Sequence, residues 1–164
     1  ILDMYVLSYN ANRQLRTASS TLKQNLKTYL SEYRMINDSI KIKDAYIINI
    51  TCEFDIIVLP NFNNNDVILR CINTLTTYFD IENWNINQPI LLKDLSILLD
   101  KVEGVQNVTN VLIKNIAGAS KGYSDYSYDL NFATNKGIIY PSVDPMVFEL
   151  KYPQSDIIGR VVPL

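Results

Sequence analysis

Two arginines, Arg13 and Arg16, are the first candidates for a reactive site, because they follow a strand-like segment and precede a predicted helix. Guanidinium groups can bind a phosphate together with the backbone amides of a helix N-terminus. A phosphate-binding loop usually contains glycine, which lets the backbone approach the anion, and residues 8–18 contain none. The pattern favours solvent-exposed arginines. A small phosphate-handling hydrolase that uses Arg13 and Arg16 is the alternative function.

Carboxylates supply two further candidates. Glu53 and Asp55 share one face of a predicted strand, where neighbouring carboxylates could act as general acid and base. Residues 63–66 (Asn-Asn-Asn-Asp) offer oxygen ligands for a cation, but they lack the closing glutamate of a calcium loop, and helix capping explains them better. Histidine is absent, which excludes chemistry that needs an imidazole. We predict a protein that is not an enzyme and has no metal and no cofactor.

Composition and cysteine spacing weigh against several classes of partner. The net charge of −2 gives no electrostatic attraction to nucleic acid or to an anionic membrane. The glycines form no G-x-G-x-x-G or P-loop pattern. Cys52 and Cys71 lie in apolar segments, so we expect two buried thiols, with a disulfide as the alternative. We expect no nucleic acid, membrane or small-molecule partner.

Hydrophobic periodicity predicts the elements that position these residues. The expected order is strand, helix, strand, strand, helix, short helix and strand, over residues 1–9, 19–33, 39–43, 45–59, 66–79, 91–102 and 105–116. The first helix is expected to end by Asn37–Asp38, and the long strand over 45–59 alternates between apolar and polar residues. We predict an α+β fold, a ferredoxin-like β-α-β-β-α-β sandwich with an extra short helix and a C-terminal β extension.

The composition changes after Gly118, where a polar stretch with three tyrosines precedes short β-type segments separated by prolines. Tyrosine in a polar loop suits a protein interface, because it combines a large ring with a hydroxyl group. We therefore predict a domain over 1–116 and an interface arm over 117–164. The predicted interface residues are Tyr123, Tyr126, Tyr128, Tyr140, Phe148 and Tyr152. The alternative is that the tyrosines fold back onto their own sheet.

The chain resembles the C-terminal part of the baseplate wedge ring protein of T-even-like contractile-tail phages, which is related to the baseplate J-like family. The similar segments are residues 26–40 (LKTYLSEYRMINDSI), the strand pair up to residue 59, the helix over 66–79, residues 95–105 (LSILLDKVEGV) and residues 140–150 (YPSVDPMVFEL). Ile1 is not an initiator Met and lies in a strand-like pattern, so we expect a longer parent chain.

That resemblance implies a structural role. Wedge subunits contact copies of themselves and other baseplate wedge proteins, close a ring around the tail hub and rearrange when the sheath contracts. It further implies a location in the tail baseplate of the virion, after synthesis in the host cytoplasm. The partners implied are a second copy, as a homodimer or ring, and other wedge proteins. No catalytic residues are implied.

Overall fold

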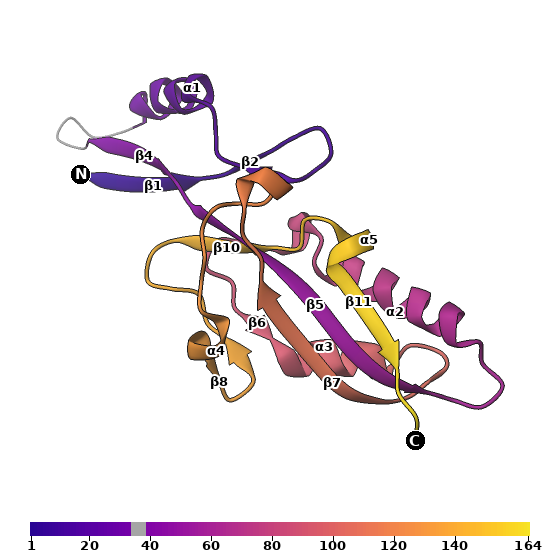
Figure 1. The fold of residues 1–164 in the computed structure, drawn as a ribbon. Helices are drawn as coiled ribbons and strands as arrows, with labels where there is room; N and C mark the ends of the chain where they lie inside the picture. The colour runs from indigo at the N-terminus through magenta and orange to yellow at the C-terminus, as the bar shows by residue number, and fades with distance from the viewer. Residues whose placement is uncertain (34–38) are drawn as a thin grey trace.

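Two lobes of unequal size are joined by one long extended segment in the computed structural model of the protein, which describes residues 1–33 and 39–164 (Figure 1). The expected helix end at Asn37–Asp38 lies outside the described residues. Both lobes contain helices and strands, so the predicted α+β class is confirmed. The molecule is elongated, with its two termini at opposite ends.

The smaller lobe is a β-α-β unit with a short hairpin inserted before its helix. Its elements are β1 (Leu2–Val6), β2 (Ser8–Tyr9), β3 (Leu15–Arg16), α1 (Ser20–Ser31) and β4 (Ile40–Asp44). Strands β1 and β4 pair in parallel, with Leu2 opposite Ile40. The helix begins after Ser19, whose hydroxyl group accepts a hydrogen bond from the backbone N–H of Leu22.

The larger lobe is built around one strand of 13 residues, β5. Its strands are β5 (Tyr46–Val58), β6 (Ile90–Leu91), β7 (Val105–Asn115), β8 (Thr134–Asn135), β9 (Ile138–Ile139), β10 (Met146–Glu149) and β11 (Ile157–Val161). Its helices are α2 (Asn64–Tyr78), α3 (Leu92–Asp100), α4 (Leu130–Ala133) and α5 (Pro153–Asp156), with short 3₁₀ turns η1 (Ile81–Asn83) and η2 (Ala119–Lys121).

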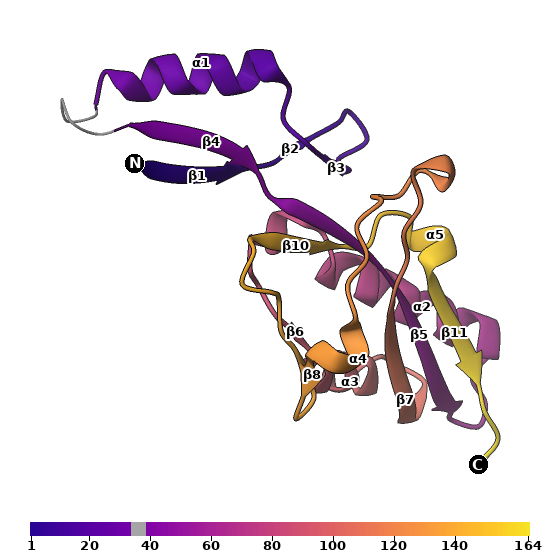
Figure 2. The ribbon, with the colours of Figure 1, turned by 60° about the vertical axis from the view of Figure 1, so that its left-hand side comes forward.

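Strand β5 is the centre of a mixed sheet. It pairs in antiparallel with β7, in parallel with β10 along its first part and in parallel with β11 along its second part. Helices α2 and α3 cover one face of this sheet and leave the part of the other face over β11 and the end of β5 open (Figures 1 and 2). The short strands β6, β9 and β8 form a separate sheet beside it.

The hydrophobic core lies between the sheet and these two helices. Cys52, Phe54 and Ile56 project from β5 into it, as the alternating pattern predicts. The helices contribute the buried residues Val67, Cys71 and Leu75 from α2 and Leu95 and Leu99 from α3. This packing fixes the direction of β5 and therefore of every strand that pairs with it.

The strand pairing differs from a ferredoxin-like sandwich, which is not confirmed. The two predicted central strands do not form a hairpin, because only Ala45 separates β4 from β5 and the chain continues in the same direction. A two-residue hairpin favours Asn-Gly or Asp-Gly at the turn, and the chain has Asp44–Ala45 there, without the glycine. Strand β4 therefore pairs with β1 in one lobe, while β5 pairs in the other.

The segment from residue 117 onward was expected to form a separate arm, but it contributes two strands to the β5 sheet. Met146, Val147 and Phe148 are all buried, as is usual for a strand covered on both faces. Gly159 of β11 lies so close to the Phe54 ring that a Cβ atom at this position would overlap with it. These strands belong to the core of the larger lobe.

The placement of β10 predicts different effects for two phenylalanines. Phe148 is 1% exposed, whereas Phe132 on α4 is 91% exposed. We expect Phe148→Ala to lower the free energy of unfolding by about 3–5 kcal/mol, because it leaves a cavity in the core. The matched control Phe132→Ala should change it by less than about 0.5 kcal/mol. Denaturant unfolding measures both, and equal small effects would show that β10 is not part of the core.

Candidate functional site

The two candidate arginines line different clefts. Arg13 lies in the loop of the β2–β3 hairpin, where its guanidinium group forms ion pairs with Glu82 at 2.5 Å and Asp80 at 3.5 Å. Arg16 lies on β3 and lines a separate cavity between the lobes. Because the two guanidinium groups do not converge on one position, the hydrolase that would use both gains no support from the geometry.

Glu53 and Asp55 take part in cross-strand ion pairs on the open face of the sheet. Lys114 of β7 lies 3.2 Å from Glu53. Arg160 of β11 lies 3.6 Å from Glu53 and 3.7 Å from Asp55. Each pair is accessible to solvent and contributes about 1 kcal/mol or less. Both carboxylates are therefore engaged with basic side chains of the two neighbouring strands.

Residues 63–66 cap α2, as the sequence predicts. The side-chain oxygen of Asn63 accepts hydrogen bonds from the backbone N–H groups of Asn65 at 2.9 Å and Asp66 at 3.3 Å. Within residues 1–33 and 39–164, no group of three or more His, Cys, Asp or Glu residues is arranged to hold a metal ion. In the same part of the chain, no helix has both the length and the apolar character that crossing a bilayer requires.

Both cysteines are free and buried, which confirms the expectation of two buried thiols. Cys52 lies on β5 and Cys71 on α2. Burial raises the pKa of Cys52 to about 12 and that of Cys71 to about 11, because a thiolate is poorly solvated in the core. At neutral pH both are therefore protonated, and neither has the thiolate character of a reactive cysteine.

The predicted interface residues divide between the interior and the surface. Phe148 is buried in the core, which corrects its assignment to a surface contact. Tyr123 and Tyr128 fold back onto their own lobe. The Tyr123 hydroxyl donates a hydrogen bond to Asp156 at 2.8 Å, and the Tyr128 hydroxyl donates one to the carbonyl of Tyr140 at 2.7 Å. For these two tyrosines, the fold-back alternative describes the structure.

The other three predicted residues lie nearer the surface. Tyr152 is half-buried and packs edge-on against Tyr123, with ring centroids 5.4 Å apart. Tyr126 and Tyr140 are exposed. Tyr126 packs edge-on against Tyr46 of β5, with ring centroids 4.7 Å apart. Only Tyr126 and Tyr140 of the six are therefore well placed for a contact outside the lobe.

A buried polar network, which the sequence analysis missed, joins the two lobes. Glu149 on β10 accepts hydrogen bonds from the Asn49 side chain at 2.8 Å and from the backbone N–H of Leu15 at 2.5 Å. Asn49 in turn accepts one from the backbone N–H of Ser124 at 2.8 Å. The signal was one glutamate in the otherwise apolar run over residues 146–150. Burial raises the pKa of Glu149, and the hydrogen bonds from Leu15 and Asn49 partly oppose that shift.

The smaller lobe leaves much of its apolar surface uncovered. Helix α1 has no buried residue; Leu22 and Tyr29 on it are 46% and 59% exposed, and Tyr33, just after its C-terminal end, is 71% exposed. The rings of the two tyrosines contact each other, with centroids 5.4 Å apart. We call Leu22, Tyr29 and Tyr33 the α1 surface.

The strands below this helix are also incomplete as a sheet. Within the described residues, β1 and β4 pair only with each other, so each has one unpaired edge. Leu2 on β1 is more than half exposed. Parallel strands normally lie inside larger sheets that are covered on both faces. In the part of the chain that the structure describes, the smaller lobe therefore lacks the further strands that would pair with the free edges of β1 and β4.

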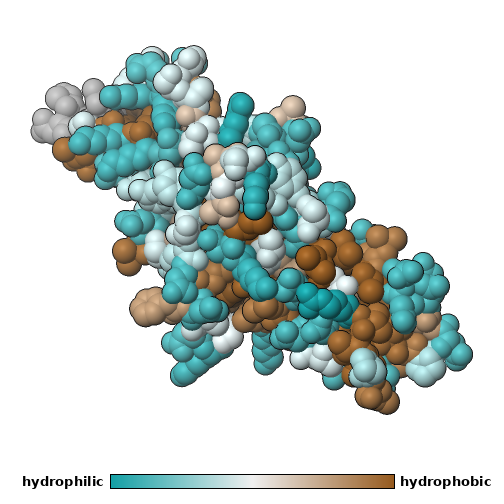
Figure 3. All heavy atoms as spheres, viewed as in Figure 1, coloured by the Kyte–Doolittle hydropathy of each residue, from teal (hydrophilic) through white to brown (hydrophobic). Residues whose placement is uncertain are grey.

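A second apolar surface lies at the far end of the larger lobe. Figure 3 shows hydrophobic side chains over β11 and the adjoining end of β5, on the face that no helix covers. Leu112 of β7 and Ile158 of β11 are exposed there and flank Glu53 in register. The ion pairs of Glu53 and Asp55 border these residues, so this face combines apolar and charged groups.

No protein-family model matches the chain, and a search of curated proteins finds no match.

The buried Glu149 predicts a particular dependence of stability on pH. Its pKa is raised in the folded state, so the folded protein holds this proton more tightly than the unfolded chain does. Relative to Glu149→Gln, which does not ionise, the wild type should lose stability as the pH rises from about 4.3, the pKa of an unperturbed glutamate, through the raised pKa. Denaturant unfolding at several pH values measures this difference, and a difference that grows with pH in favour of the wild type would contradict the assignment.

Proposed function

We propose that this protein is a structural subunit of a phage tail baseplate wedge, and that it associates with further copies of itself and with other wedge proteins to close a ring around the tail hub. The observation that carries the proposal is the uncovered α1 surface above an incomplete two-stranded sheet. The resemblance of several segments to the wedge protein supports the same function. The location that follows is the tail baseplate of the virion.

The exposed tyrosines of the α1 surface have the character of an interface. Tyr29, on the last turn of α1, and Tyr33, just after the helix, present two adjacent rings at the C-terminal end of a helix that has no buried residue. Tyrosine is enriched among residues that dominate binding energy, and a centrally buried one contributes about 2 kcal/mol or more. A partner that covers these rings would also complete the cover of the smaller lobe.

A ring subunit needs at least two contact surfaces that face different neighbours. The α1 surface lies at one end of the elongated molecule, and the open face with Leu112 and Ile158 lies toward the other end. Two surfaces separated in this way are compatible with head-to-tail contacts in a ring as well as with a two-fold dimer. A wedge subunit that binds copies of itself and also other wedge proteins needs a separate surface for each kind of partner.

The connection between the lobes is suited to the rearrangement that the function implies. One chain segment, from β4 through Ala45 to β5, crosses directly between them. The remaining cross-lobe contacts include the hydrogen bond from Leu15 to Glu149 and the ion pairs of Arg13. Leu7 and Leu15 also pack against the core of the larger lobe, so reorientation of the lobes when the sheath contracts would exchange these apolar contacts as well as the polar ones.

Replacement of the two exposed tyrosines tests the assembly. We expect Tyr29→Ser/Tyr33→Ser to weaken self-association about 30-fold or more, which corresponds to about 2 kcal/mol, because both rings lie on the α1 surface. Sedimentation over a range of protein concentrations gives the dissociation constants of the variant and the wild type.

The matched control is Tyr9→Ser, because Tyr9 is also exposed in the smaller lobe but lies on the hairpin rather than on α1. This control should leave the association unchanged. A wild-type protein that stays monomeric at every concentration, or equal effects of the two variants, would remove the support for an α1 interface.

A further inference from the structure

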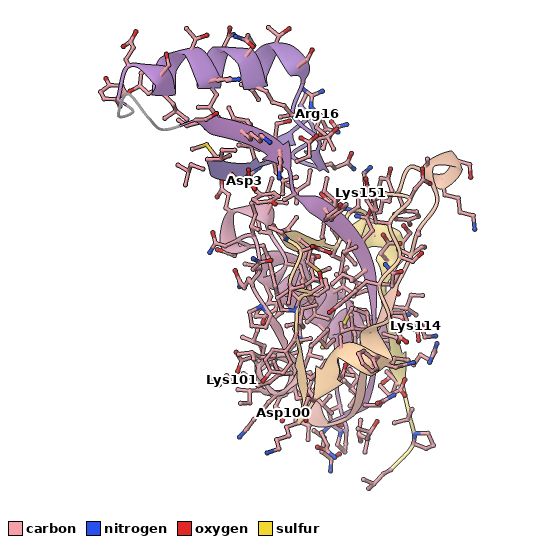
Figure 4. The ribbon with its side chains drawn as sticks, turned by 90° about the vertical axis from the view of Figure 1, so that its left-hand side faces the viewer. Asp3, Arg16, Asp100, Lys101, Lys114 and Lys151 are labelled. Atoms are coloured by element: carbon pink, nitrogen blue, oxygen red, sulfur yellow. The ribbon has the colours of Figure 1, made fainter. Side chains whose placement is uncertain are left out.

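A cavity of about 210 Å³ lies between the two lobes. The hairpin side of its wall comes from Leu15, Arg16 and Thr17, and the larger lobe contributes Ala45, Ile47, Tyr126 and Lys151, among others. Figure 4 shows Arg16 on the side of the smaller lobe and Lys151 on the side of the larger lobe, at the junction between them. The cavity therefore has basic groups from both lobes and an apolar wall from β5.

Among the described residues, the basic groups of this cavity form no ion pair at contact distance, although Glu149 shares the wall and attracts Lys151 electrostatically. Within residues 1–33 and 39–164, neither Arg16 nor Lys151 forms an ion pair. The Lys151 ammonium group donates a hydrogen bond to the carbonyl of Gly122, which holds it beside the cavity. Arg16 contrasts with Arg13, whose guanidinium group is paired with two carboxylates in the neighbouring cleft. Of the two basic groups, Arg16 is therefore the one without a carboxylate partner in the described part of the chain, and an anionic ligand would supply that partner.

The buried polar groups of the wall are already satisfied. Both oxygens of Glu149 accept hydrogen bonds, one from Leu15 and the other from Asn49. The side-chain oxygen of Asn49 accepts a hydrogen bond from the backbone N–H of Ser124. These groups hold the wall in place and need no ligand. Two basic groups also outnumber the single carboxylate, so the local charge balance favours an anion.

The size of the cavity restricts the ligand. Sites for drug-sized ligands measure about 300–1,000 Å³, and the volume here is smaller than that range. A cavity of this size suits a small polar group on a short stem. Ala45 and Ile47 favour an apolar stem, and a guanidinium group binds a carboxylate through two parallel hydrogen bonds.

We propose that this cavity binds a carboxylate carried on a short apolar stem, as in a glutamate side chain or a small dicarboxylic acid. Arg16 and Lys151 bind the carboxylate, and the residues of β5 contact the stem. Because the ligand touches both lobes, its binding also stabilises their relative position. This site is independent of the α1 surface, so the proposed assembly and the proposed ligand can fail separately.

The test uses the whole chain and two matched probes. The α-amide of N-acetylglutamate carries one carboxylate, on its side chain, and the α-amide of N-acetylglutamine is its neutral isostere. We expect saturable binding of the acid by calorimetry and much weaker binding of the neutral probe. Glutarate serves as a third probe: tighter binding than the blocked glutamate indicates a free small acid, and weaker binding indicates an acidic residue of a protein segment.

Substitutions at the two arginines locate the site. Loss of a charged hydrogen-bond partner costs about 1.5–3 kcal/mol, so Arg16→Gln should weaken binding of the acid by about tenfold or more. Arg16 is exposed, so the variant is expected to fold, and an unchanged thermal midpoint without ligand verifies this. Arg13→Gln is the matched control and should bind as the wild type does.

Three results would overturn the proposal. The first is no saturable binding of either acid by the wild-type chain. The second is equal affinity for the acid and its neutral isostere, because the basic groups would then have no role. The third is binding that Arg16→Gln leaves unchanged or that Arg13→Gln weakens equally, because the ligand would then lie elsewhere.

Discussion

Strand β5 pairs with three other strands and packs against two helices, and the rest of the larger lobe depends on this arrangement. One face of the strand carries Cys52, Phe54 and Ile56 into the core, and the other carries Glu53 and Asp55 toward basic residues of β7 and β11. Because side chains alternate along a strand, a slip of one residue would place these carboxylates in the core. The free-energy cost of burying Glu53 and Asp55 therefore disfavours a shifted pairing register for β5.

The same strand explains why the protein has two lobes. The chain reaches β5 from β4 with only Ala45 between them, so the β4 end extends beyond the sheet that covers β5. The smaller lobe must then stabilise itself with one helix, the β1–β4 pair and the short β2–β3 hairpin, and it leaves the α1 surface uncovered. Glu149 and Arg13 connect this lobe to the larger one through polar contacts. Both the cavity between the lobes and the uncovered α1 surface follow from the direct passage of the chain from β4 through Ala45 to β5.

Much of the local structure was predictable from the sequence, and the long-range pairing was not. Alternation identified β5, and Asn63 marked the start of α2, because both signals depend on near neighbours along the chain. The apolar run over 146–150 indicated a strand, but its partner 100 residues earlier leaves no local pattern. Glu149 was visible as a glutamate in that run, although its partners Leu15 and Asn49 come from two distant segments. The ferredoxin-like arrangement is not confirmed, because the chain runs from β4 through Ala45 into β5 and these two strands pair in different sheets.

Hydrogen exchange of the backbone amides tests the central claim, that the smaller lobe is completed by a partner, most directly. In dilute protein the amides of β1 and α1 should exchange fast, because few buried contacts hold this lobe together. At concentrations where the protein associates, the account predicts slower exchange in β1 and α1 and little change in β5. Exchange in β1 and α1 that stays equally fast in the associated protein would contradict the account.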